Sequence, residues 1–132
     1  MPKATQLNLK LENRTGILAR LCRDLASGGV NLLALSAPPA PAPKGPIRLL
    51  VVNRELAEHV LSEAAYEYEV EEVLFVDIKH RPGALAKTME KLAAADVEVR
   101  YAYATADLKA KTSAVVIAVG DHQLDAAEKL LG

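Results

Sequence analysis

The chain has 132 residues, of which 51% are hydrophobic, and its 16 basic and 17 acidic side chains leave a formal net charge of −1. That charge balance argues against a nucleic-acid or membrane-surface partner. No apolar run reaches the roughly 18 residues of a membrane span, and the start of the sequence lacks a signal-peptide pattern. A single cysteine, Cys22, excludes an internal disulfide and a multi-thiolate metal site, so we expect a cytoplasmic globular protein.

The first predicted strand alternates apolar and polar residues, with Leu7, Leu9 and Leu11 on one face and Gln6, Asn8 and Lys10 on the other. The segment 13–16 forms a tight turn. A helix follows, because apolar residues recur at steps of three and four: Ile17, Leu18, Leu21, Cys22 and Leu25. On this stripe Cys22 is expected to be a buried, inert thiol.

Glycines at 28 and 29 predict the end of this helix. Two strands are expected next, at 30–37 and 47–52. The connector 38–46 holds five of the seven prolines, so a stiff extended link is favoured over a ligand for a proline-recognising domain. A second helix starts near Asn53, a good N-cap residue, and a fourth strand at 68–72 runs almost directly into Val73.

The second half of the chain repeats the first after 67 positions. Segment 11–37 aligns with 78–104 without a gap, and eight of the 27 pairs are identical, where chance would give about two or three. The copied elements are a strand to Ile78, a turn at 80–83, a helix ended by Asp96, strands at 97–104 and 114–119, and a helix from near Asp121.

The order of elements predicts an α+β fold of two ferredoxin-like (βαββαβ) repeats, 1–72 and 73–132, with antiparallel sheets and helices on one face. The second repeat ends after its second helix and lacks its last strand. The open edge left beside 73–78 would be an aggregation hazard. We expect the continuous 68–78 segment, a partner subunit or residues outside this chain to cap it.

Both repeats carry the same kind of strand-to-helix turn, ENRTGIL at 12–18 and KHRPGAL at 79–85, and Gly29-Val30-Asn31 follows the first helix. These segments resemble the ACT domain, a ferredoxin-like module that senses amino acids. The resemblance covers nearly the whole chain and is closest to the small stand-alone tandem ACT proteins of bacteria and archaea. The resemblance implies a non-catalytic, homodimeric regulatory protein that binds an amino acid at an ACT–ACT interface without a cofactor.

In the serine-sensing ACT domain of phosphoglycerate dehydrogenase, two Asn residues that hold the effector match Asn13 and Asn31. Leu11 stands where that domain has a His, and the second copy has His80 and Glu98 at the two Asn positions. Glycine lets a ligand approach the backbone at a helix start, where free N–H groups suit a carboxylate. The candidate ligand-binding residues are Asn13, Arg14, Gly16, Ile17, Leu18, Asn31, His80, Arg81, Gly83 and Leu85.

A structural interpretation competes with each of these assignments. Glycine serves the backbone shape of such turns whatever binds there, Asn13 can simply cap its helix, and the two turn arginines, Arg14 and Arg81, can simply be exposed.

Two further function classes compete with the sensor. The alternative is a regulatory or interaction subunit of an amino-acid metabolic enzyme, which pairs sheets or helices with its partner and has no effector. An enzyme is not expected, because neither turn carries a phosphate loop or a nucleophile–base set. The three histidines lack metal-ligand spacing, and strand residues 49–52 lack the basic and aromatic side chains that read RNA.

Overall fold

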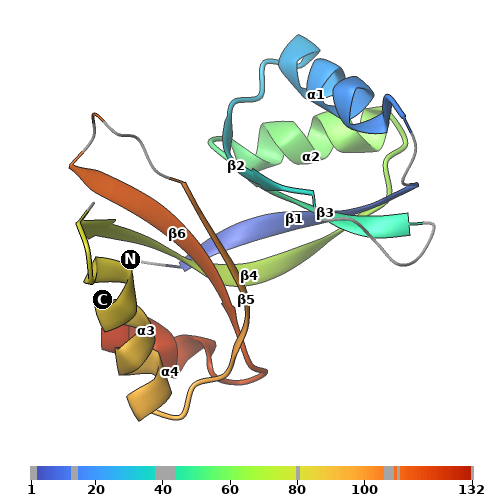
Figure 1. Ribbon diagram of the computed structural model, residues 1–132. Coiled ribbons are helices and arrows are strands. Elements are labelled where there is room, and N and C mark those ends of the chain that lie inside the picture. Colours follow the sequence, from blue (N-terminus) through green and yellow to red (C-terminus); the bar gives the residue numbers. More distant parts are fainter. Residues whose placement is uncertain are drawn as a thin grey trace. The chain divides into compact units, whose positions relative to one another are not determined.

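The computed structural model in Figure 1 describes residues 3–12, 15–37, 44–79, 81–105, 109 and 111–131. Its elements are β1 (Lys3–Glu12), α1 (Ile17–Ser27), β2 (Leu32–Ser36), β3 (Lys44–Val51), α2 (Arg54–Glu63), β4 (Tyr68–Lys79), α3 (Ala84–Ala94), β5 (Val99–Thr105), β6 (Thr112–Val119) and α4 (Leu124–Leu131). The chain divides into an N-terminal unit, Thr5–Glu71, and a C-terminal unit, Glu72–Gly132 together with Met1–Ala4.

In the N-terminal unit the strands follow the order β2-β3-β1-β4. β3 pairs antiparallel with both β1 and β2, with Leu7 opposite Leu49. Helices α1 and α2 cover one face of this sheet (Figure 1). Because strand side chains alternate between faces, Leu7 and Leu9 reach the helices and are fully buried, as the alternation predicted. The core consists of Leu7, Leu9, Leu21, Leu25, Val30, Ile47, Leu49, Val51, Ala57 and Leu61.

The polar face of β1 is less simple than the sequence suggests, because Gln6 is also fully buried. Its Nε2 donates a hydrogen bond to Asn8 Oδ1 at 2.7 Å, and Asn8 Nδ2 donates to Glu71 Oε1 at 2.8 Å. A buried amide is tolerated where hydrogen bonds satisfy it. This chain of bonds therefore joins β1 to the first part of β4.

The C-terminal unit repeats this plan, with antiparallel pairing of β4 with β6 and of β6 with β5. Helices α3 and α4 cover one face (Figure 1), over a core of Leu74, Leu92, Val97, Val115, Ile117, Val119 and Ala127. The predicted α+β class of ferredoxin-like repeats is confirmed.

The start of β1 occupies the last-strand position of the second repeat. Lys3 and Ala4 belong to the C-terminal unit, and β1 is the hydrogen-bonded neighbour of β4. The sequence-based expectation did not include this solution: the strand comes from the other end of the same chain. Strands β1 and β4 thus each contribute to both units.

Several predicted boundaries shift. β4 is one unbroken strand, Tyr68–Lys79, where two successive strands were expected, and β3 begins at Lys44, inside the predicted connector. Residues 38–43 of that connector lie outside the described part of the chain. The predicted helix start near Asp121 is wrong, since α4 begins at Leu124. Before it, Gln123 Nε2 donates to Asp96 O at 3.0 Å and Gln123 Oε1 accepts from Glu98 N at 2.9 Å, so tertiary bonds hold the preceding turn.

Candidate functional site

The two strand-to-helix turns have the same backbone geometry. Gly16 precedes α1 with φ 86° and Gly83 precedes α3 with φ 88°, both in the left-handed region. A Cβ on either glycine would meet nothing within 4 Å. Glycine is therefore required by backbone conformation rather than by crowding, because L side chains rarely adopt this φ.

Within the described residues, neither of the helices that follow these glycines has a side-chain cap or an acidic residue in its first turn. α2 is different: Asn53 Oδ1 accepts a hydrogen bond from Leu56 N at 3.1 Å, and Glu55 lies in the first turn. Uncapped helix starts present backbone N–H groups and a partial positive charge. The turns before α1 and α3 thus share a feature that suits an anionic group.

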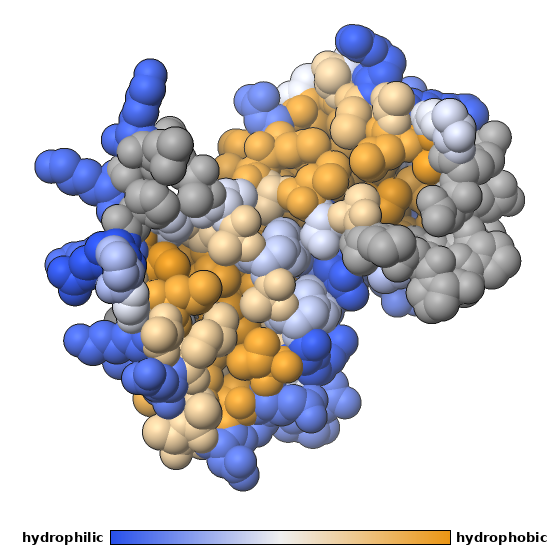
Figure 2. Space-filling view, viewed as in Figure 1, coloured by the Kyte–Doolittle hydropathy of each residue, from blue (hydrophilic) through white to orange (hydrophobic). Residues whose placement is uncertain are grey.

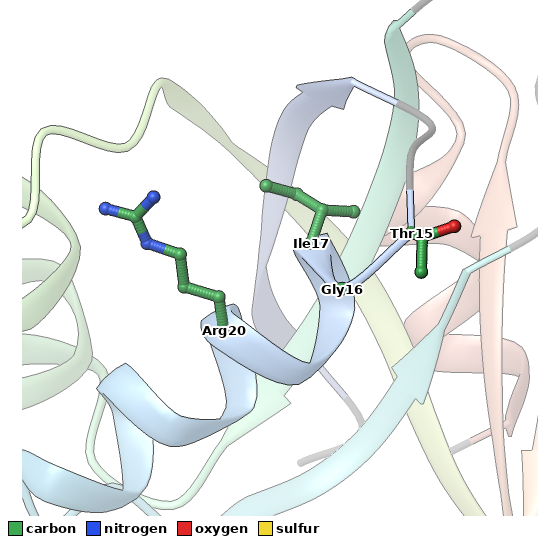
Figure 3. A pocket seen from close by; sticks show the side chains of 4 residues that line it. All are labelled: Thr15, Gly16, Ile17 and Arg20. Carbon is green, nitrogen blue, oxygen red and sulfur yellow. The ribbon is translucent and has the colours of Figure 1, made fainter.

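A small hollow lies at the start of α1, with a volume of about 130 Å³. It is lined by Thr15, Gly16, Ile17 and Arg20. Figure 3 shows Ile17 and Arg20 extending on the same side of the first helical turn, while Thr15 points away from them. All four lining residues come from the segment 15–20, so the hollow is open to one side and is not a closed pocket.

The predicted site residues fall into four groups. Gly16 and Ile17 line the hollow. Leu18 is partly buried and packs against the N-terminal core, and Asn31 is exposed before β2, where its carbonyl accepts a hydrogen bond from Val52 N at 3.0 Å. In the second copy Arg81, Gly83 and Leu85 are exposed. Asn13, Arg14 and His80 lie outside the described residues.

Two lining residues, Thr15 and Arg20, were not among the sequence candidates. The repeat offered a signal for Arg20, because Lys87 stands 67 positions later and both copies therefore carry a cation in the first helical turn. A cation in the first helical turn opposes the helix dipole, so Arg20 and Lys87 each cost stability unless an anionic group lies nearby. The backbone of both residues bonds alike: Arg20 N donates to Gly16 O at 3.0 Å and Lys87 N to Gly83 O at 3.0 Å.

Other side chains of α1 near the hollow serve the packing of the N-terminal unit. Cys22 is half-buried on α1, and Tyr66 OH donates to Asp24 Oδ2 at 2.6 Å, which ties α1 to the end of α2. Burial, followed by this hydrogen bond, raises the pKa of Tyr66 to about 12.

Within the described residues no group of three or more His, Cys, Asp or Glu side chains could hold a metal ion, and no helix there could cross a membrane.

Known proteins that are similar to this chain are found by comparison of structures. No protein-family model and no curated protein matches the sequence. Protein BT0572 from Bacteroides thetaiotaomicron is similar at a TM-score of 0.87 and 29% identity, over 98% of this chain and 87% of that chain. The ligand-free regulatory subunit of aspartate kinase from Thermus thermophilus is similar at 0.65 and 15% identity, over 99% of this chain and 95% of that chain.

Aspartokinase III of E. coli, in complex with lysine and aspartate, is similar at a TM-score of 0.55 and 14% identity, over 98% of this chain and 29% of that chain. At these low identities the two kinase structures establish a shared fold.

Proposed function

We propose that the chain is a non-catalytic regulatory protein of amino-acid metabolism, made of two ACT repeats (1–72 and 73–132), which binds an amino acid. The observation that carries the proposal is the duplicated left-handed glycine turn, in which Gly16 and Gly83 stand at the N-cap position of a helix and have no side chain to cap it. The fold that this chain shares with aspartate kinase regulatory subunits supports the same role.

In the proposed complex the α-carboxylate of the ligand lies at the start of α1. The backbone N–H groups of the first turn and the Arg20 guanidinium supply charge-assisted hydrogen bonds there. Asn13 and Asn31 are the proposed polar contacts of the ammonium group, because an amide oxygen accepts its hydrogen bonds. Arg14, Ile17 and Leu18 complete the first-copy set, with His80, Arg81, Gly83 and Leu85 as the second.

The open form of the hollow favours a site completed by a second ACT surface. The lining residues all come from the segment 15–20 and leave the other side open, which supports binding at an ACT–ACT interface of a homodimer. The proposed protein acts in the cytoplasm, and its downstream partner is an amino-acid metabolic enzyme.

The test is a thermal-shift and calorimetric titration of the whole chain with each of the twenty amino acids. One amino acid, or one chemically related group, is expected to raise the melting temperature. A free concentration of about 100 times Kd would add about 2.7 kcal/mol to the free energy of unfolding. If all twenty leave both signals unchanged at millimolar concentration, the sensor function is wrong.

A matched pair of glycine variants tests whether the amino acid binds at the turn before α1. Gly16→Ala and Gly29→Ala both put Cβ on a residue with positive φ, 86° and 80°, and in both cases the added carbon meets nothing within 4 Å. Both should therefore lose similar stability, about 1 kcal/mol. Only Gly16→Ala should weaken amino-acid binding; equal binding by the two variants would contradict the site.

An interaction subunit without an effector is the second candidate, and one observation favours it. β2 is the edge strand of the N-terminal unit and exposes Leu32 and Leu33, and Val52 beyond β3 is 64% exposed. Figure 2 shows apolar surface on the side of this unit where α2 and β2 lie in Figure 1. Here Leu33→Lys should abolish copurification with the catalytic subunit of an amino-acid metabolic enzyme, whereas amino acids should change nothing.

A further inference from the structure

The start and the middle of β1 are anchored very differently. Leu7 and Leu9, in the part that belongs to the N-terminal unit, are fully buried. Ala4 is only partly buried and Lys3 is exposed. Each fully buried Leu contributes about 1.5–3 kcal/mol of apolar burial, so the middle of β1 is held by its core and its first residues are not.

The first residues are held by an ion-pair cluster instead. Lys3 Nζ lies 2.5 Å from Asp125 Oδ1 and 3.8 Å from Glu128 Oε1, both on α4. Glu72, on β4, adds a third negative charge that acts on Lys3. The side chain of Lys3 is 35% exposed, that of Asp125 81% and that of Glu128 12%, so solvent and salt screen the shorter Lys3–Asp125 pair most.

These first residues occupy the last-strand position of the C-terminal unit, beside β4. We propose that residues 3–5 form a detachable strap, which closes this position and opens while the rest of β1 stays paired. Segments with little apolar burial and exposed ion pairs open at the low end of a protein's local free energies. The strap fits that description, and the open state leaves an unpaired strand edge on β4 in the C-terminal unit.

Hydrogen exchange read by mass spectrometry on the whole chain tests the strap. In the wild type, residues 3–5 should exchange faster than residues 7–11. Lys3→Ala should speed exchange of the strap and of 72–79 by about two- to fivefold, and Lys3→Glu by about tenfold, because it places a carboxylate against three others. Neither variant should change the exchange of residues 7–11.

Lys10 supplies the matched control. It lies on the same strand and forms a comparable ion pair, with Nζ 3.2 Å from Glu69 Oε1, within the N-terminal unit. Lys10→Ala and Lys10→Glu should therefore leave the exchange of residues 3–5 unchanged. If Lys3→Glu unfolds the chain, the wild type in high salt is the second measurement, because screening should also speed strap exchange.

Two results would overturn the strap. One is exchange of residues 3–5 as slow as that of residues 7–11 in the wild type, which means that β1 opens only as a whole. The other is an equal effect of the Lys3 and Lys10 variants on residues 3–5. Neither readout involves an amino acid, so the strap stands or fails independently of the proposed function.

Discussion

Replacement of Gly28 by Ala probes the packing between α1 and α2. Gly28 caps the end of α1 with φ −87° and ψ 2°, a conformation that Ala adopts without strain. On backbone grounds alone, this substitution would stabilise the protein by about 0.4–1 kcal/mol, because Ala restricts the unfolded chain. The neighbouring side chain reverses that sign.

A Cβ at position 28 would lie 2.3 Å from Val60 Cγ2 and 3.4 Å from Val60 Cβ and Cγ1. Ordinary contact therefore requires Cγ2 to move by about 1 Å. Val60 lies within α2, where a β-branched side chain has one strongly preferred rotamer. Overpacking of this kind costs about 1–3 kcal/mol, so a net loss of about 1–2 kcal/mol in the free energy of unfolding is expected.

Urea unfolding followed by far-UV circular dichroism measures the effect, with a double-mutant cycle to assign it. Val60→Ala alone should cost about 1 kcal/mol in lost burial. The double variant Gly28→Ala/Val60→Ala should be more stable than additivity predicts by about 1–2 kcal/mol, because the clash is gone. Gly29→Ala is the control, since its strain is conformational and Val60→Ala should not relieve it. A Gly28→Ala protein as stable as the wild type, or an additive cycle, would refute this reasoning.

Two further predictions concern hydrogen bonds of the N-terminal unit. Tyr66 has its pKa raised from 10.0 to about 12, so the folded state holds the phenol proton more tightly than the unfolded chain does. Its contribution is complete below pH 10 and should be lost as pH rises towards 12, so urea midpoints should fall across that window in the wild type and less in Tyr66→Phe. Asn53→Ala removes the α2 cap and should cost about 1 kcal/mol in thermal or urea unfolding, whereas Asn53→Asp, which keeps an acceptor oxygen, should cost much less.

Local features of this chain were readable from the sequence, because local rules produce them. Alternation places Leu7 and Leu9 in the core, and Asn53 caps its helix as expected. The turns at 16 and 83 require a left-handed φ, and glycine adopts it because it has no Cβ, so the residue type alone indicates the conformation. Asp96, predicted as the counterpart of the helix-ending glycines, also has a positive φ, 59°.

The candidate site could be located only in part. The repeated turn identified Gly16 and Ile17, but Arg20 joins the hollow because the first turn of α1 turns its side chain to the same side as Ile17 (Figure 3). Leu18, one position further, is partly buried and packs against the core. Which neighbours of a glycine turn face outward depends on how the helix packs, and a motif does not specify that.

Sequence periodicity and turn chemistry determined the class of fold, because both act over a few neighbouring residues, and the identities repeated after 67 positions revealed its duplication. Only the tertiary structure decided how the second repeat is completed and why Gln6 is buried. Those outcomes depend on partners far along the chain: Asn8 and Glu71 are 63 positions apart, and Lys3 and Asp125 are 122 apart. A strand pairs with whichever edge the fold brings beside it, and no local pattern encodes that choice.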